Sequence, residues 1–183
     1  AVSYGVRIHV LPEFTPDGTL EAIEAGATLM FLVPAAIQIM IQHPKAAETD
    51  FSGLRYLMYG AAPMPLELLK EAVKTMPDTG FMQVYGMTET TGTVSLLPPE
   101  DHDLGGNERM RSAGKAVPGV KIEIRGSDNT EVPRGEIGEI CIHSPSNTAG
   151  YWQLPEATAK TIDPDGWLHT GDLCSMDARG YST

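Results

Sequence analysis

The sequence is poor in cysteine, in basic residues and in long apolar runs, and each shortage excludes a class of protein. It contains only two cysteines, Cys141 and Cys174, so we expect free thiols of a reducing cytosol and no disulfide framework or CxxC zinc site. Thirteen Lys and Arg oppose 24 Asp and Glu, a formal net charge of −11, which argues against a nucleic acid as partner. The longest apolar run, residues 29–41, is shorter than the about 20 residues of a membrane-spanning helix. We therefore expect a cytoplasmic protein with no integral membrane segment.

Several common catalytic signatures are also missing. The glycine-containing segment 114–119 is followed by Val120 and lacks the Lys-Ser/Thr pair of a Walker loop. Neither GxSxG nor HExxH occurs. The five histidines have no metal-ligand spacing, and Glu136 and Glu139 fit the solvated edge of a strand. These patterns give no support to a Walker-type phosphate loop, a GxSxG hydrolase or a histidine-bound metal site.

Residues 1–97 alternate between strand-like and helix-like patterns. Thr15 precedes Pro16 as a helix cap followed by a first-turn proline, and an apolar stripe at helical spacing follows Pro65. The run 28–33 is continuously apolar, as in a strand that is buried on both faces. Strands are predicted over 6–10, 28–33, 54–59 and 81–85, with helices after Thr15, over 34–41 and over 66–76. This order predicts a parallel sheet with helices on its faces.

From residue 98 the pattern changes to period-two alternation. Val120, Ile122 and Ile124 alternate with charged residues, and a turn cluster at 126–129 separates them from a second alternating run at 137–142, which predicts an antiparallel hairpin. Two further short strands are predicted over 167–170 and 173–176. The predicted fold class is therefore α/β, with part of a parallel sheet and flanking helices in an incomplete subdomain 1–97. A mostly antiparallel, barrel-like β subdomain, also incomplete, follows over 98–183.

Two predicted strands end in loops of unusual composition, and ligands of parallel sheets bind at such ends. Gly60-Ala61-Ala62 has only small side chains, which allow a flat ligand to approach the backbone closely. The alternative is a plain turn into the helix that begins after Pro63 and Pro65.

The second loop, residues 85–92, contains an aromatic ring, a hydroxyl and a carboxylate. The ring of Tyr85 is suited to stacking on a planar base, the hydroxyl of Thr88 to donating to a phosphate, and Glu89 to holding Mg²⁺. Alternatively, Thr88 caps a helix and Glu89 lies in its first turn. Asp172 follows Gly171 at a predicted strand end, where it either accepts two hydroxyl hydrogen bonds, as from ribose, or serves only the turn.

Six segments, in this order, resemble the signatures of the adenylate-forming superfamily, which includes acyl-CoA synthetases, luciferases and peptide-synthetase adenylation domains. The match covers nearly the whole chain. The segments are 60–63 (GAAP), 85–90 (YGMTET, resembling YGxTE), 112–119 (SAGKAVPG), 135–140 (GEIGEI), 150–158 (GYWQLPEAT) and 166–173 (GWLHTGDL).

The resemblance implies a nucleotide site and a reaction. Thr88 and Glu89 would act in catalysis, with Glu89 as the Mg²⁺ ligand and Thr88 on the α-phosphate of ATP. The nucleotide-binding residues it implies are Gly60, Ala61 and Ala62 beside adenine and the acyl pocket, Tyr85 on adenine, Gly86 and Met87 between nucleotide and acyl group, and Asp172 on the ribose. The carboxylate of an organic acid would attack the α-phosphate of ATP, and the thiol of CoA would then displace AMP.

The family's phosphate loop, its hinge and the C-terminal domain with the catalytic lysine have no counterpart in these 183 residues. The chain is therefore expected to be an internal fragment that is inactive without the rest of the synthetase chain. The expected parent is an acyl-CoA synthetase for a fatty acid or another small organic acid. The alternatives are an adenylation domain of another class, such as an aryl-CoA ligase or a peptide synthetase, and a noncatalytic nucleotide-binding scaffold.

Overall fold

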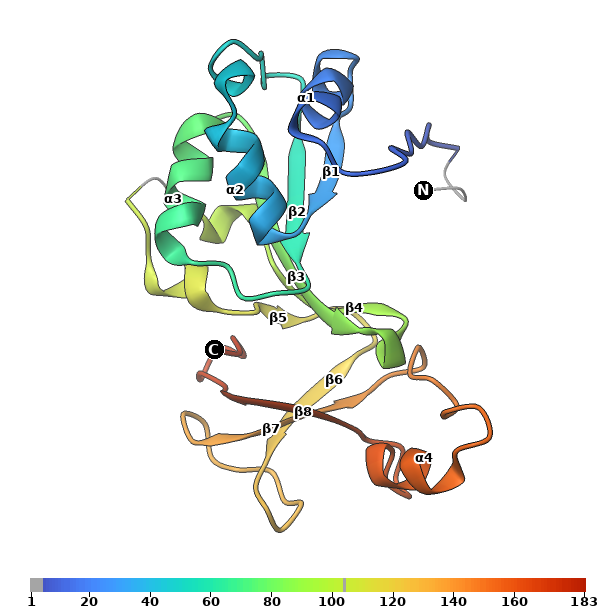
Figure 1. The fold of residues 1–183 in the computed structure, drawn as a ribbon. Helices are drawn as coiled ribbons and strands as arrows, with labels where there is room; N and C mark the ends of the chain where they lie inside the picture. Colours follow the sequence, from blue (N-terminus) through green and yellow to red (C-terminus); the bar gives the residue numbers. More distant parts are fainter. Residues whose placement is uncertain (1–4, 104) are drawn as a thin grey trace. The chain divides into compact units, whose positions relative to one another are not determined.

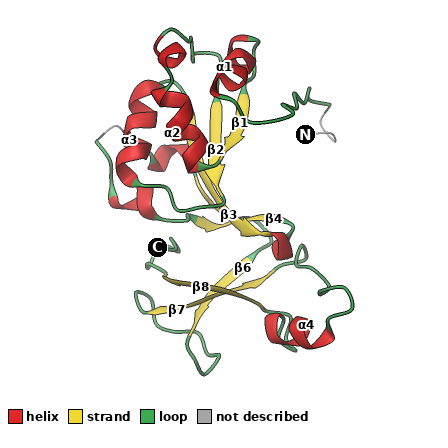
Figure 2. Cartoon of the chain, in the orientation of Figure 1, coloured by secondary structure: helices red, strands yellow, loops and turns green. Residues whose placement is uncertain are grey.

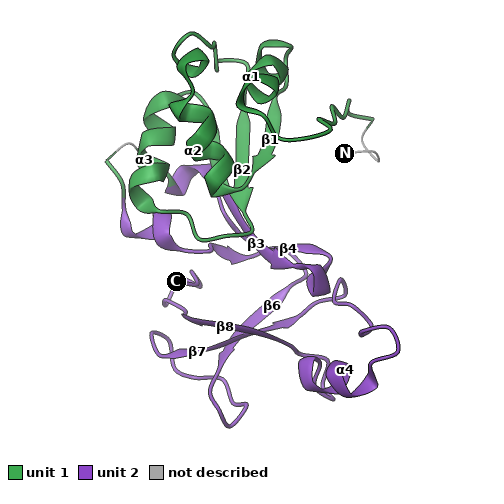
Figure 3. Ribbon diagram, in the orientation of Figure 1, with its two compact units in different colours: residues 1–82, 102–106 green, residues 83–101, 107–183 purple. Residues whose placement is uncertain are grey.

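The computed structural model describes residues 5–103 and 105–183 and divides into two compact units. The first unit comprises residues 1–82 and 102–106, and the second comprises residues 83–101 and 107–183 (Figure 3). Strand β3 (Gly80–Met87) begins in the first unit and continues in the second. The predicted subdomain boundary after residue 97 remains a prediction.

The first unit is a parallel α/β arrangement, as the sequence predicts (Figure 1). Strands β1 and β2 pair in parallel, in register from Leu29↔Tyr56 to Leu32↔Tyr59. A helix connects these two parallel strands, as in a βαβ unit. In chain order the elements are α1 (Pro16–Glu24), β1 (Leu29–Leu32), α2 (Pro34–Gln42), a 3₁₀ turn (Pro44–Ala47), β2 (Tyr56–Gly60) and α3 (Leu66–Thr75).

Local sequence signals explain where these helices begin and which side they bury. The Thr15 Oγ1 accepts the backbone N–H of Gly18 at 3.1 Å, which confirms the predicted cap of α1. In α3, Leu69 and Ala72 are fully buried, and so is Met76 directly after the helix. Burying such a stripe contributes most of the stability of a short amphipathic helix.

Two predictions for this unit are wrong. Residues 6–10 form no strand, and Val6, Ile8 and Val10 are exposed, because a strand needs a hydrogen-bonded neighbour and an alternating pattern does not supply one. Strand β1 is not buried on both faces either, since Leu29 and Phe31 are 54% and 50% exposed. It is an edge strand of its sheet, and only its alternate residues Met30 and Leu32 are partly buried.

The second unit is mostly antiparallel, as predicted (Figure 2). The part of β3 that belongs to the second unit pairs antiparallel with β4 (Gly92–Leu97). Strand β4 also pairs antiparallel with the two-residue β5 (Lys115–Ala116). A second sheet has the order β6 (Lys121–Arg125), β7 (Ile137–His143), β8 (Leu168–Ser175). The remaining elements are three 3₁₀ turns (Thr88–Thr90, Pro99–Asp101, Glu108–Arg111) and helix α4 (Pro155–Thr161).

The two short strands predicted around Gly171-Asp172 form one continuous strand. β8 runs through both residues, and its register with β7 shifts between Glu139 and Cys141. A register shift of this kind lets a strand bend without ending. Side chains of both sheets form the core of the unit, with Tyr85 packed against the buried cluster Val94, Ile124, Ile140, Ile142, Cys174 and Met176.

Asp101 is a buried carboxylate, 4% exposed, whose two oxygens both have partners in the second unit. Its Oδ1 lies 2.7 Å from the Arg109 Nη1, and its Oδ2 accepts the hydroxyl of Tyr181 at 2.7 Å. Burial opposes ionisation, but the hydrogen bonds from Arg109 and Tyr181 outweigh it and lower the pKa of Asp101 below its ordinary value of 3.8. The bonds thereby fix the C-terminal residues to the two 3₁₀ turns.

None of the helices formed by the described residues has the length and apolar character that a bilayer crossing requires.

Replacing Tyr181 by Phe removes only the hydroxyl, because the ring stays beside the cations of Arg109 and Lys115. We expect Tyr181→Phe to lower the free energy of unfolding by about 1.5–3 kcal/mol, as for a lost hydrogen bond to a charged group. Urea denaturation measures this. The control is Tyr56→Phe, at an exposed tyrosine, which should change stability by less than about 0.5 kcal/mol. An equal effect in both variants would contradict the assigned role of the hydroxyl.

The same pair of proteins tests the charge of Asp101. A carboxylate whose pKa is lowered by folding stabilises the protein above its unfolded pKa, and this stabilisation is lost as the pH falls through the folded pKa. The stability difference between the wild type and Tyr181→Phe should be complete at about pH 6 and shrink at about pH 3. Urea denaturation at both pH values checks this, and a difference independent of pH would show that Asp101 is not the charged acceptor.

Candidate functional site

The turn that follows β3 depends on Gly86, because any side chain at this position would require the backbone to move. A Cβ at Gly86 would lie 1.8 Å from the carbonyl oxygen of Gly92. The β3–β4 register shifts between Tyr85 and Gly86. The chain therefore folds back on itself directly after Tyr85, and Thr88 and Glu89 follow at the tip.

Buried Thr90 holds this tip together. Its Oγ1 accepts the backbone N–H of Met87 at 3.0 Å and lies 2.9 and 2.8 Å from the carbonyl oxygens of Met87 and Gly92. The turn Thr88–Thr90 is a 3₁₀ turn of three residues with Met87 at its N-cap position. The alternative role of Thr88 as a helix cap is therefore wrong, whereas Glu89 does lie in the first turn, as that alternative predicted. The side chain of Thr88 is exposed.

Tyr85 and Asp172, which are 87 residues apart in sequence, are joined by a hydrogen bond. The Tyr85 hydroxyl donates to the Asp172 Oδ2 at 2.6 Å. Partial burial, and then this bond to a carboxylate, raise the pKa of Tyr85 above its ordinary value, so the phenol stays a donor. A carboxylate has about four acceptor positions, and exposed Asp172 therefore retains capacity for further donors.

The backbone around Asp172 is fixed by β7. Gly171 has φ +78° and donates its N–H to the Glu139 Oε1 at 2.8 Å. The Thr170 hydroxyl donates to the Ile140 carbonyl at 2.9 Å and accepts the N–H of Asp172 at 3.1 Å. These bonds present the Asp172 carboxylate to solvent at a defined position.

Glu89 is fixed by a loop that sequence reasoning did not connect with it. The Tyr151 hydroxyl donates to the Glu89 Oε1 at 2.7 Å, and the Thr148 N–H donates to the Glu89 carbonyl at 2.6 Å. The bond to Glu89 raises the pKa of Tyr151. The hydroxyl of Thr91 donates to the carbonyl of Ser146 at 2.8 Å and joins the same loop to the turn.

The three small residues Gly60, Ala61 and Ala62 belong to the first unit and lie at the end of β2. Gly60 is buried, Ala61 and Ala62 are exposed, and Ala61 has the left-handed φ of +63°. This conformation is uncommon for a residue with a Cβ.

Of the predicted site residues, Tyr85, Gly86, Met87, Thr88, Glu89 and Asp172 all lie in the second unit. Tyr85 and Asp172 are in direct contact, while Thr88 and Glu89 share one turn. Tyr151 and Glu139 are additional residues that position Glu89 and Gly171. Tyr151 and Glu139 lie inside segments 150–158 and 135–140, which resemble the family's signatures. The sequence of these segments does not indicate which distant residues the two side chains contact.

Comparison with protein families and curated relatives identifies one consistent group. The family model described as AMP-binding enzyme matches residues 1–152. The chain is 39% identical over 178 residues to a fatty acid–[acyl-carrier-protein] ligase, ScoC, of Streptomyces coeruleorubidus, covering 97% of this chain and 34% of the relative. It is 34% identical over 182 residues to an indoleacetate–CoA ligase of Aromatoleum aromaticum, covering 99% of this chain and 34% of the relative. The chain therefore spans about a third of the length of these relatives.

Solved structures give the same result. The amide bond synthetase McbA from Marinactinospora thermotolerans has a TM-score of 0.86 at 36% identity, covering 94% of this chain and 34% of that chain. MatB from Rhodopseudomonas palustris has a TM-score of 0.81 at 32% identity, covering 94% and 33%. The mixed α/β fold is thus that of the corresponding third of these proteins.

Gly86→Ala tests the close approach of the two backbones. We expect it to lower the free energy of unfolding by about 1–3 kcal/mol, the usual cost of overpacking, because the Gly92 carbonyl must move. The control is Gly53→Ala, at a position where a Cβ meets nothing within 4 Å. Urea denaturation of both variants checks this, and a Gly86→Ala protein as stable as the control would contradict the described loop.

Proposed function

Because the chain belongs to the AMP-binding enzyme family, we propose that its second unit binds the nucleotide of ATP within an AMP-forming acid–thiol ligase. The observation that carries this proposal is the hydrogen-bonded pair of Tyr85 and Asp172. It sets an exposed carboxylate, suited to ribose hydroxyls, beside an aromatic ring suited to a base.

We assign Asp172 to the ribose and the ring of Tyr85 to adenine. Tyr85 packs against the hydrophobic cluster of the second unit, and its hydroxyl is hydrogen-bonded to Asp172, so the ring is held before a ligand arrives. Preorganisation of this kind lowers the entropic cost of binding. We further propose that Gly60, Ala61 and Ala62 contact ligand through their backbone, and that Gly86 and Met87 lie between the nucleotide and the acyl group.

Thr88 and Glu89 are the proposed catalytic pair. The Thr88 side chain is exposed at the start of its turn, ready to donate to the α-phosphate. Glu89 fits a Mg²⁺ ion: Tyr151 is a neutral donor to its Oε1 and so leaves the carboxylate charge in place, and protein sites for Mg²⁺ commonly use one or two carboxylates together with phosphate oxygens. When bound there, Mg²⁺ would neutralise charge that develops on the phosphate oxygens.

The proposed reaction has two steps. A carboxylate oxygen of the acid attacks the α-phosphorus of ATP, the bond to the pyrophosphate oxygen breaks, and acyl-AMP and pyrophosphate form. The sulfur of CoA then attacks the acyl carbonyl, AMP leaves, and the thiol proton is released. Donors aimed at the α-phosphate, such as the Thr88 hydroxyl, stabilise the charge of the first transition state.

The acid is proposed to be a fatty acid or another small organic acid, because named relatives act on fatty acids and on indoleacetate. CoA is the proposed acceptor, and a cytoplasmic location remains part of the proposal. The isolated 183-residue chain should bind nucleotide weakly and form no thioester. The alternatives are an adenylation domain of another class, such as an aryl-CoA ligase or a peptide-synthetase domain, and a noncatalytic nucleotide-binding scaffold. They are less favoured, because relatives at 39% and 34% identity are named as fatty-acid ligases.

Calorimetric titration of the chain with AMP and with Mg²⁺-ATP tests the nucleotide site. Asp172→Ala should weaken binding of both about tenfold to a hundredfold, as for the loss of hydrogen bonds to a charged group. The control is Asp165→Ala, which removes an exposed carboxylate from a turn of the same unit and should bind like the wild type. Wild-type chain that binds neither nucleotide, or an equal loss in both variants, would contradict the proposed site.

A further inference from the structure

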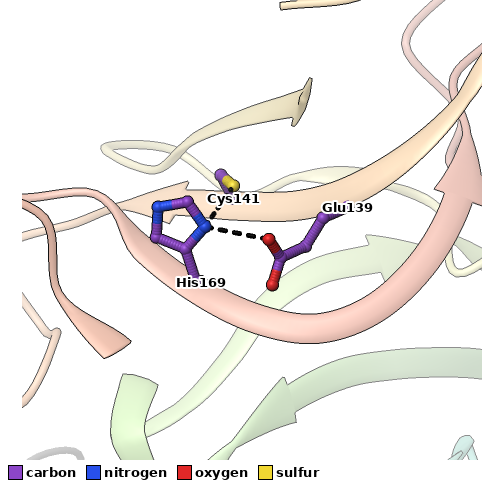
Figure 4. Close-up of side chains that lie close together, drawn as sticks. All are labelled: Glu139, Cys141 and His169. Carbon is purple, nitrogen blue, oxygen red and sulfur yellow. Dashed lines mark hydrogen bonds and ion pairs between the residues drawn. The ribbon is translucent and has the colours of Figure 1, made fainter. Parts of the chain in front are cut away.

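Three potential metal ligands converge where β7 meets β8, from elements that are far apart in the sequence (Figure 4). Glu139 and Cys141 are two residues apart on β7 and so point to the same face of the sheet. His169 on β8 is the cross-strand partner of Cys141. The His169 Nδ1 lies 2.9 Å from the Glu139 Oε2 and 3.4 Å from the Cys141 Sγ, and all three donor atoms lie within 4.8 Å of one another.

These separations suit a small tetrahedral site. With Zn–N near 2.0 Å and Zn–S near 2.3 Å, neighbouring ligand atoms are about 3.3–3.8 Å apart. The two distances from the His169 Nδ1, 2.9 and 3.4 Å, reach that range with shifts of a few tenths of an ångström. Thiolate, imidazole and carboxylate together form a borderline-soft set, which zinc-class ions favour and Mg²⁺ and Ca²⁺ do not.

A second carboxylate, that of Asp163, lies on the other side of the His169 ring. A carboxylate in this place is common for histidines that bind metals. The Asp163 Oδ2 lies 3.9 Å from the His169 Nε2, the ring nitrogen that faces away from the cluster. Asp163 is itself held by the N–H groups of Trp167 and Asp165, at 2.9 and 3.0 Å. While no ion is bound, the Nδ1 carries the ring proton, because it is hydrogen-bonded to the Glu139 carboxylate at 2.9 Å. An ion at Nδ1 would displace this proton, and the ring would change to the tautomer protonated on Nε2, the nitrogen that faces Asp163.

The charges around the cluster favour a cation. Glu123, Glu139 and Asp163 contribute three negative charges, and Arg125 contributes one positive charge, a sum of −2 with neutral His169. Arg125 is already paired with Glu123 at 2.8 Å and Asp163 at 3.2 Å, and its guanidinium lies over the Trp167 ring. Cys141 is buried, while Glu139 and His169 are half-buried, so the cluster is reached from solvent through these two side chains.

We propose that the chain binds one zinc-class divalent ion through the Cys141 Sγ, the His169 Nδ1 and the Glu139 Oε2. On binding, the Cys141 thiol loses its proton to solvent and Glu139 keeps the Gly171 N–H on its other oxygen. The ion would clamp β7 to β8 three residues before Asp172. The site does not depend on the proposed ligase reaction, since none of its ligands is assigned to the nucleotide.

Metal titration of the reduced, chelator-treated chain tests this proposal. We expect one equivalent of Zn²⁺ per chain, measured by competition with a chromophoric chelator. With Co²⁺ as the probe, we expect the near-ultraviolet band of a cobalt–thiolate bond. Cys141→Ala should abolish the band and weaken Zn²⁺ binding at least a hundredfold. The matched control is Cys174→Ala, which removes the other buried thiol and should keep both.

A second variant covers the case in which Cys141→Ala fails to fold, as circular dichroism would show. His169→Gln keeps the thiol and removes the nitrogen ligand, so it should weaken Zn²⁺ binding at least tenfold. The proposal is overturned if the wild type binds no stoichiometric Zn²⁺ or gives no cobalt–thiolate band. Equal losses in Cys141→Ala and Cys174→Ala would also overturn it. In those cases the three side chains form only a hydrogen-bonded cluster.

Discussion

The register shift between β7 and β8 is the constraint on which both proposed sites of the second unit depend. A bulge lets one strand bend while pairing continues on both sides of it. Here it frees Glu139 to accept the N–H of Gly171 and brings His169 opposite Cys141. A perfectly regular pairing would direct alternate residues of 170–172 back against the sheet, and Asp172 would lose its position beside Tyr85.

The sequence predicted well what is local. The order of strands and helices in the first unit, the cap at Thr15 and the antiparallel hairpin of β6 and β7 all follow from spacing within a few residues. The prediction failed where the outcome depends on a distant partner: residues 6–10 alternate correctly but have no pairing strand, and β8 runs on through Gly171-Asp172 because β7 supports it. The motif residues were found, yet their contacts with Glu139 and Tyr151 were not, since these bonds span 32 and 62 residues.

The carboxylates of this acidic chain have specific partners, and these partners differ in charge. The buried carboxylate of Asp101 has both an arginine and a phenol as partners, and Asp163 shares Arg125 with Glu123. Glu89 and Asp172 differ from these, because the partner that each side chain has among the described residues is a neutral tyrosine hydroxyl. A neutral donor orients a carboxylate without cancelling its charge, so the chain's uncompensated negative charge is retained at the two positions where a metal ion and sugar hydroxyls are proposed.

Tyr85 belongs to two systems at once, since its ring is part of the apolar packing of the second unit and its hydroxyl holds Asp172. Any ligand that stabilises one arrangement of Asp172 therefore also favours one packing of the interior, and by linkage a better-ordered interior binds that ligand more tightly. Evolution can thus adjust the affinity of such a site through the volume of buried residues that never touch the ligand.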